Sequence, residues 1–291
     1  MPVFYRRLPQ FCFLSPQSIE EAVRFLAAHE GEAKPLAGGT DLIPGLKRRE
    51  IASPAYILDL KGLNELKKIN FDPQVGLRIG ALATIQDIGR HPDMRRLFPS
   101  LVQAACCMAS PQVRNRGTFA GNICSAVPSA DSAPALLSLN ANVRVRGSGG
   151  ERIIPLDQFF VGPGETALRP DEIVTALTVP RPADRSVYLK LSPRHSMDMA
   201  IVGVAAAANL IPGGVRDVQI ALGAVAPTPM RAHKAEEILQ GRPVSQELIE
   251  EAARAAAAEC RPIDDYRASA AYRRDMVYVL TRRALEQVLA V

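Results

Sequence analysis

The chain has 291 residues, of which 47% are hydrophobic and 22% are charged, which is the composition of a globular protein and not of a disordered or fibrous one. At roughly 150 residues per domain, this length favours about two domains. The 35 basic and 30 acidic residues give a formal net charge of +5, and the basic residues occur in short pairs, which indicates a solvated surface rather than a nucleic-acid-binding stripe.

The cysteine pattern and the apolar segments bear on the compartment. The five cysteines are odd in number, form no CxxC pair and have no histidine at zinc-ligand spacing, so we expect no structural disulfides and a reducing environment. The N-terminal residues lack a long apolar segment behind a basic start. The longest apolar stretch, residues 199–211, contains Asn209 and is shorter than the ~20 residues that span a bilayer. These features predict a cytoplasmic protein without membrane contact.

The N-terminal part alternates helical and strand-like segments. Ser15 and Pro16 fit the start of a helix, and Gly31 fits its end. Residues 34–37 form a short run that ends at two glycines. Residues 55–60 and 75–81 have the pattern of strands.

The middle of the chain continues this mixture. Residues 84–90 predict a short helix, and apolar residues from Leu97 to Met108 form the face of a second one. A helix over 133–139 precedes strands at 141–147 and 173–179, with a hairpin turn of glycines at 147–150.

The proline-rich residues 180–184 mark the best domain boundary. Three strands are expected beyond it, over 187–191, 201–210 and 218–226, with a hairpin turn at 212–214. Three helices then follow, over 231–240, 246–260 and 270–289. The order of elements predicts an α+β protein.

Two consecutive glycines, Gly38 and Gly39, stand between a short apolar run and a helical stretch within Pro-Leu-Ala-Gly-Gly-Thr-Asp-Leu-Ile-Pro, residues 35–44. Glycine permits positive φ and close approach of the backbone to a ligand, and successive N–H groups in such a turn bind phosphate. Thr40 and Asp41 add side chains that form hydrogen bonds. The alternative is a tight strand-to-helix turn without a ligand.

A second segment of small and polar residues, Asn-Arg-Gly-Thr-Phe-Ala-Gly-Asn, occupies residues 115–122. Two such loops far apart in sequence suggest a clamp on one diphosphate. Neither loop has the G-x-G-x-x-G of a dinucleotide-binding βαβ unit or the Gly-Lys-Ser/Thr of a P-loop.

Residues 37–41 and 118–122 resemble the two FAD-binding motifs, A-G-G-x-[SD] and T-[IV]-G-G-N, of the flavoprotein (medium) subunits of molybdenum hydroxylases. This family includes the CO dehydrogenase medium subunit and the FAD domain of xanthine dehydrogenase. The second motif departs from the pattern where Ala120 replaces its first glycine. Further similar segments in the family's order, at 111–115, 188–194, 198–204, 227–232 and 263–274, extend the resemblance over essentially the whole chain.

The resemblance implies an α+β fold of FAD-binding type 2, like that of vanillyl-alcohol oxidase and p-cresol methylhydroxylase. Two FAD-binding subdomains are expected, at residues 1–57 and 58–179. Residues 180–291 are expected to form a C-terminal α+β domain with a three-stranded antiparallel sheet and a helix bundle.

The resemblance also implies that the chain binds FAD non-covalently and has no catalytic or metal-binding residue of its own. Asp131 matches an acidic residue of the family that accepts hydrogen bonds from the cofactor. Ile173 or Val174 matches an apolar residue that contacts the adenine, and Lys190 matches a lysine near the flavin ring. The alternative for Lys190 is a lysine on a strand surface. The residues implied to bind the cofactor are Leu36, Ala37, Gly38, Gly39, Thr40, Asp41, Thr118, Phe119, Ala120, Gly121, Asn122, Asp131, Ile173, Val174 and Lys190.

Two nearby residue types have other interpretations. Met108 falls where some relatives place an aromatic residue over the flavin, but core packing is the preferred role. Cys106, Cys107 and Cys124 suggest an iron–sulfur site, which we reject because an adjacent cysteine pair is a poor cluster scaffold.

The resemblance implies an FAD-binding electron-transfer subunit of an oxidoreductase complex. Its partners would be a small subunit with [2Fe-2S] clusters and a large subunit with a molybdenum cofactor, assembled as a dimer of heterotrimers. One alternative is a free-standing flavin-dependent oxidoreductase of the same fold, and another is a basic binding or scaffold module without enzyme activity.

Overall fold

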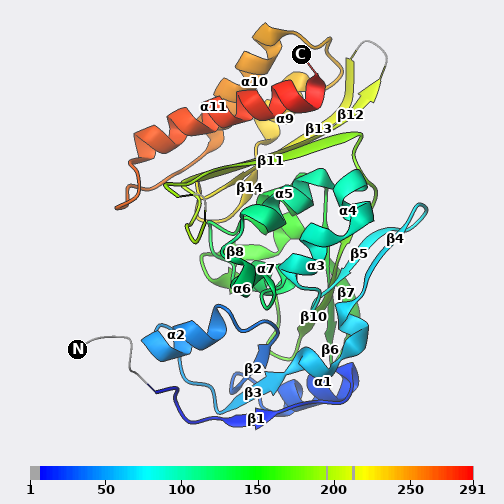
Figure 1. The fold of residues 1–291 in the computed structure, drawn as a ribbon, viewed down its shortest axis with the longest axis vertical. Helices are drawn as coiled ribbons and strands as arrows, with labels where there is room; N and C mark the ends of the chain where they lie inside the picture. Colours follow the sequence, from blue (N-terminus) through cyan, green and yellow to red (C-terminus); the bar gives the residue numbers. More distant parts are fainter. Residues whose placement is uncertain (1–6, 195, 212–213, 291) are drawn as a thin grey trace.

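Three large sheets follow one another along the long axis of the molecule, in the order of the sequence (Figure 1). The computed structural model describes residues 7–194, 196–211 and 214–290. No helix among these residues is both long enough and apolar enough to cross a membrane.

The first sheet is parallel and has the strand order β1-β3-β2. Its elements are β1 (Cys12–Leu14), α1 (Ile19–Ala28), β2 (Ala33–Leu36), α2 (Leu42–Arg48) and β3 (Tyr56–Asp59). The expected helix start at Ser15 and Pro16 is wrong by three residues, because the side chain of Ser18 accepts the Glu21 N–H and caps the helix there.

The second sheet is antiparallel, with the order β4-β5-β10-β6-β7. Its strands are β4 (Ile69–Asp72), β5 (Gly76–Gly80), β6 (Asn142–Gly147), β7 (Gly150–Pro155) and β10 (Ile173–Val179). Between them lie η2 (Leu60–Gly62), η3 (Asn64–Lys67), η4 (Leu156–Gln158) and the small hairpin of β8 (Phe160–Gly162) and β9 (Glu165–Thr166). The turn expected at 147–150 joins β6 to β7, but β4 was not expected, because its four residues are too few to show a period.

Six short helices connect β5 to β6: α3 (Ile85–Arg90), α4 (Pro92–Leu97), α5 (Pro99–Cys107), α6 (Pro111–Arg114), α7 (Phe119–Cys124) and α8 (Ser132–Leu137). The single helix expected to carry Leu97 to Met108 is wrong. Pro99 begins a new helix after Phe98, because proline fits only the first turn of a helix.

The third sheet is antiparallel, with the order β11-β12-β13-β14, and its strands are β11 (Arg185–Leu191), β12 (Val202–Ile211), β13 (Gly214–Gly223) and β14 (Met230–Arg231). The expectation of three strands is corrected to four, because the two residues of β14 pair with Ala221 and Leu222. In the hairpin turn expected at 212–214, Pro212 and Gly213 lie outside the described residues.

Helices cover both faces of the third sheet. On one face lie α9 (His233–Leu239), α10 (Gln246–Glu259) and α11 (Ala270–Leu289), and α5 packs on the other (Figure 1). α8 contacts the same face as α5. The central core therefore includes Tyr188, Ala205, Ala207 and Ala221 of this sheet beside residues of the preceding helices. The packing is so close that a Cβ atom at Gly223 would lie 2.7 Å from Pro134 Cγ of α8.

One buried arginine fixes the start of α11. Arg273 is 3% exposed and donates to the carbonyl oxygens of Ile201 and Ala224, at 2.6 and 3.0 Å, and to Asp265 at 2.8 Å. Burial alone would raise the pKa of Asp265, but the backbone N–H groups of Arg267 and Ala268 and the Arg273 guanidinium outweigh burial and lower this pKa to about 2. The segment before α11 is thus bound to the ends of two strands.

Candidate functional site

The first glycine motif forms the turn between β2 and α2. Gly39 has φ of +74°, in the left-handed region that favours glycine. The backbone N–H groups of Gly38, Gly39, Thr40 and Asp41 donate no hydrogen bond within the described part of the chain. Successive free N–H groups around a left-handed residue form a concavity that binds anions, so this turn fits a phosphate.

The second motif is the beginning of α7 and not a free loop, which corrects the expectation of a second glycine loop. Thr118 is the N-cap of this helix, and its hydroxyl accepts the N–H of Gly121 at 2.9 Å. Ala120 and Gly121 lie inside the helix and do not have positive φ. The alanine that departs from the family pattern is therefore compatible with the backbone here.

The structure brings the two motifs into contact. A Cβ atom at Gly38 would lie 2.2 Å from the carbonyl oxygen of Arg116, and one at Gly117 would lie 3.2 Å from Thr40 Oγ1. On the other side of the turn, the Ser125 hydroxyl donates to Asp41 Oδ2 at 2.7 Å. The turn at Gly38 to Asp41 and the start of α7 thus form one continuous surface.

A chain of side-chain hydrogen bonds continues from the second motif toward the third sheet. Ser132 Oγ donates to Asn122 Oδ1 at 2.6 Å. Asp131, which directly precedes Ser132, accepts hydrogen bonds from Tyr188 and Lys190 of β11. The side chains of Asp131 and Lys190 are only 9% and 7% exposed. Lys190 is therefore a buried partner of Asp131, and not the surface lysine of the alternative interpretation.

The two apolar residues expected near the adenine are neighbours on β10. Ile173 and Val174 point to opposite faces of the strand, because side chains alternate. Ile173 lies in the same hydrophobic cluster as Ala37 of the first motif, whereas Val174 belongs to the central core. Leu36 is buried with Leu46 and Ile57 under the turn.

Of the remaining candidates, Met108, Cys107 and Cys124 lie in or against the central core, whereas Cys106 is exposed. Met108 is buried in the central core, as the preferred interpretation predicted. Burial raises the pKa of the Cys107 and Cys124 thiols to about 12, so both are protonated at neutral pH. Within residues 7–194, 196–211 and 214–290, no three potential metal ligands gather.

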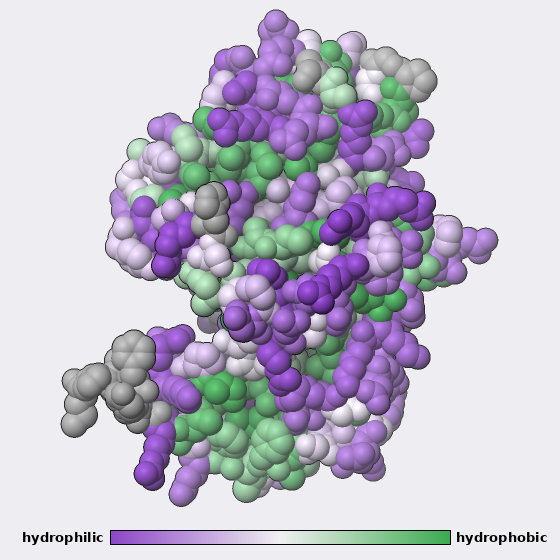
Figure 2. Space-filling view, viewed as in Figure 1, coloured by the Kyte–Doolittle hydropathy of each residue, from purple (hydrophilic) through white to green (hydrophobic). Residues whose placement is uncertain are grey.

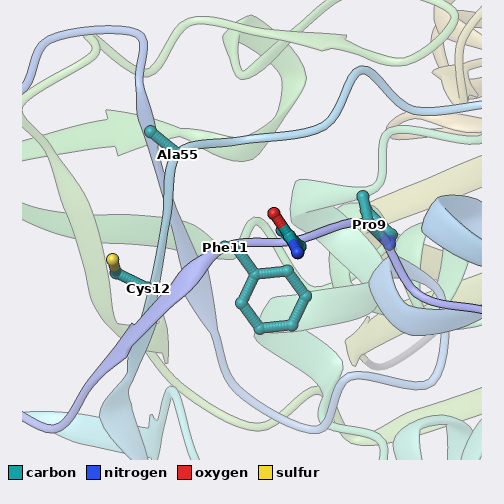
Figure 3. A pocket seen from close by; sticks show the side chains of 5 residues that line it. Pro9, Phe11, Cys12 and Ala55 are labelled. Atoms are coloured by element: carbon teal, nitrogen blue, oxygen red, sulfur yellow. The ribbon is translucent and has the colours of Figure 1, made fainter.

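Two surface features lie near the N-terminal sheet. In Figure 2 the left side of the molecule is hollowed between the lobe that carries α2 and the part that carries α6 and α7. A separate pocket is lined by Pro9, Gln10, Phe11, Cys12 and Ala55. Figure 3 shows this pocket beside β1, and it contains no residue of either glycine motif.

Sequence reasoning missed three side chains that organise the site. Ser125 follows Gly121 by four residues, so helical spacing could have placed it beside the motif. Tyr188 precedes Lys190 by two residues in a strand, which puts both on one face. Ser132 gave no local signal, because it meets Asn122 only through the packing of α7 and α8.

Comparison with known proteins covers almost the whole chain. Residues 9–182 match the family described as the FAD binding domain in molybdopterin dehydrogenase, and residues 187–288 match the CO dehydrogenase flavoprotein C-terminal domain. The glyceraldehyde dehydrogenase medium chain of Sulfolobus acidocaldarius is 35% identical over 96% of this chain and 99% of its own length. The carbon monoxide dehydrogenase medium chain of Hydrogenophaga pseudoflava is 34% identical over 97% of this chain and 98% of its own.

Solved structures agree with these sequence matches. A structure of carbon monoxide dehydrogenase from Hydrogenophaga pseudoflava that lacks the Mo-pyranopterin moiety of the molybdenum cofactor superposes with a TM-score of 0.93 at 35% identity, and the match covers 98% of this chain and 99% of that one. Quinoline 2-oxidoreductase from Pseudomonas putida 86 matches with a TM-score of 0.90 at 27% identity, over 97% and 98% of the two chains. The mixed α/β fold is therefore that of the medium subunits.

Proposed function

This chain belongs to the family of FAD-binding medium subunits of molybdenum hydroxylases, and from that membership we propose that it carries electrons between the iron–sulfur clusters of a partner subunit and an external acceptor. When bound, FAD supplies the redox chemistry, and the protein supplies its position and electrostatic surroundings. In this proposal the chain needs no side chain that acts as an acid or base on the organic substrate.

The observation that carries the proposal is the contact between the two glycine motifs. The turn at Gly38 to Asp41, whose backbone N–H groups donate no hydrogen bond to any described residue, lies against the segment that leads into α7. The part of FAD that fits such a surface is the diphosphate, because its negatively charged oxygens accept hydrogen bonds from several N–H groups at once.

Individual residues take the following roles in the proposal. Residues 36–41 and 118–122 line the pyrophosphate and the ribityl chain, and Asp131 accepts a hydrogen bond from the cofactor. Ile173 contacts the adenine in preference to Val174, since Ile173 shares a cluster with the first motif. Lys190 lies near the flavin ring.

We propose a layout of FAD-binding type 2, with subdomains at 1–57 and 58–179 and a C-terminal domain at 180–291. The end of β10 at Val179 and the separate core between the third sheet and α9–α11 support the second boundary. The complex would contain a small subunit with [2Fe-2S] clusters and a large molybdenum subunit, as a dimer of heterotrimers in the cytoplasm.

The first test concerns how the cofactor is held. We expect the purified protein to contain one FAD that acid precipitation releases into the supernatant, because no histidine occupies either motif. Absorbance of the supernatant at flavin wavelengths measures the release. Flavin that stays with the pellet would show a covalent link.

The second test concerns partnership. Under anaerobic conditions, the organic substrate should bleach the flavin absorbance of the intact complex and leave that of the isolated subunit unchanged. The reason is that the proposal places substrate oxidation on the molybdenum subunit, and the described residues of this chain hold no cluster of potential metal ligands. Rapid bleaching of the lone subunit would instead favour a free-standing flavin oxidoreductase.

A further inference from the structure

Three buried polar side chains meet at the interface between α8 and the third sheet. Tyr188 Oη donates to Asp131 Oδ1 at 2.7 Å, and Lys190 Nζ donates to Asp131 Oδ2 at 2.8 Å. Lys190 Nζ also donates to the carbonyl oxygen of Asp198 at 3.0 Å. Within the described ranges, Asp131–Lys190 is the one ion pair that joins a residue before 180 to a residue after it.

The Asp131 carboxylate is bound by the C-terminal unit and not by its own helix. Asp131 is the N-cap of α8, yet its side chain makes no capping hydrogen bond. Each carboxylate oxygen has about two acceptor positions, so one remains on each oxygen after Tyr188 and Lys190 have donated. The trio therefore orients a charged acceptor that still has free lone pairs.

Tyr188 is itself held in one place. Its backbone N–H donates to Gln103 Oε1 of α5 at 2.7 Å. Its ring lies over Gly203 of β12, where a Cβ atom would come within 2.8 Å of the Tyr188 hydroxyl oxygen. The hydroxyl can thus reach Asp131 only because β12 has glycine at this position.

Asp131 is linked to the second glycine motif through the residue that follows it. Ser132, the next residue, donates to Asn122 Oδ1 at 2.6 Å. α7 and α8 also contact each other directly. A shift of Asp131 would therefore move the side chain of Asn122.

We propose that Tyr188 is a positioning residue of the flavin site: with Lys190 it holds the Asp131 carboxylate ionised and in place, which makes the C-terminal unit part of the FAD-binding site. This inference rests on the proposed function, because it assumes that FAD binds at the two motifs. Tyr188 itself lies outside both motifs.

The charges around Asp131 give the proposal a pH signature. The titratable groups that face its carboxylate are Lys190 and Tyr188 of β11 and Cys107 of α5. Burial raises the pKa of Asp131, and Lys190 and the Tyr188 hydroxyl oppose that rise. Loss of the hydroxyl removes one of these opposing hydrogen bonds and should raise this pKa further, which favours the protonated form of Asp131 as the pH falls.

The test is the dissociation constant of FAD from the flavin-free full chain, measured by quenching of flavin fluorescence between about pH 6 and pH 8. We expect Tyr188→Phe to weaken binding about tenfold, the effect of one hydrogen bond to a charged group. The weakening should increase as the pH is lowered from 8 to 6, and more strongly than in the unsubstituted protein. Asp131→Asn in the Tyr188→Phe background should abolish the pH dependence, since no carboxyl group remains to titrate.

Tyr278→Phe on α11 is the matched control, because within the described residues the Tyr278 hydroxyl makes no hydrogen bond, and it should bind FAD as the unsubstituted chain does. Tyr188→Phe with unchanged FAD affinity at every pH would overturn the inference, even if thermal stability fell. Absence of saturable FAD binding by the unsubstituted chain would instead overturn the proposed function itself.

Discussion

Gly38→Ala should weaken FAD binding at least about 100-fold, although it adds only one methyl group. A Cβ atom at Gly38 would lie 2.2 Å from the carbonyl oxygen of Arg116, and this neighbour is backbone, which cannot rotate away. The turn must therefore move off the segment before α7. Loss of two N–H bonds to a phosphate would cost about 3 kcal/mol, which is about a 100-fold change in the dissociation constant.

The matched control for this substitution is Gly149→Ala. A Cβ atom at Gly149 has no atom within 4 Å, and this residue lies in the turn between β6 and β7, away from both motifs. Titration of flavin-free protein with FAD should therefore give the unsubstituted affinity for Gly149→Ala. Equal FAD affinities for the two variants would show that contact between the motifs is not required for binding.

Arg273→Met should lower the free energy of unfolding by about 3–5 kcal/mol, because it removes one buried donor from three acceptors, at about 1–3 kcal/mol for each acceptor left unsatisfied. The substitution leaves two carbonyl oxygens and the Asp265 carboxylate without their buried donor. Denaturant unfolding followed by circular dichroism measures the change. Arg274→Met is the control, because Arg274 is exposed on the same helix, and its effect should stay within about 0.5 kcal/mol.

The same pair gives an acid dependence with a defined sign. The pKa of Asp265 is lowered from 3.8 to about 2 in the folded protein, so its ionised form stabilises the fold by roughly 2 kcal/mol above about pH 4. This contribution is lost as the pH falls through the folded value. Arg273→Met should make the loss of stability between about pH 4 and pH 2 shallower, and an unchanged acid slope would contradict this account.

The elements that the sequence predicted well are those with a long period or a strong turn signal. The strand at 173–179 and the helix at 270–289 were expected with the bounds that the structure has. The start of α1 was misplaced, because Ser15 and Ser18 are both good caps and only the structure shows which hydroxyl accepts an N–H group. Strands of two to four residues, such as β4 and β14, form through pairing with neighbours and leave no period to detect.

The site was partly predictable for a similar reason. The two motifs could be found because glycine and small residues mark turns and helix starts within a few positions of one another. Their contact through Gly38 and Arg116 depends on how separate elements pack, and so do the bonds from Tyr188 and Ser132. The spacing of residues within one segment does not predict contacts between residues that are far apart in the sequence.

Gly223 packs closely against Pro134, which limits how freely residues 9–182 or residues 187–288 could be exchanged for the corresponding segment of a relative. The third sheet contributes side chains to the core of the preceding unit, so that unit has no outer surface of its own on this side. A chimera that joined residues 9–182 to the C-terminal segment of a relative would place foreign side chains inside that core. Recombination at the proline-rich link would therefore disturb this core in the way that a core substitution does.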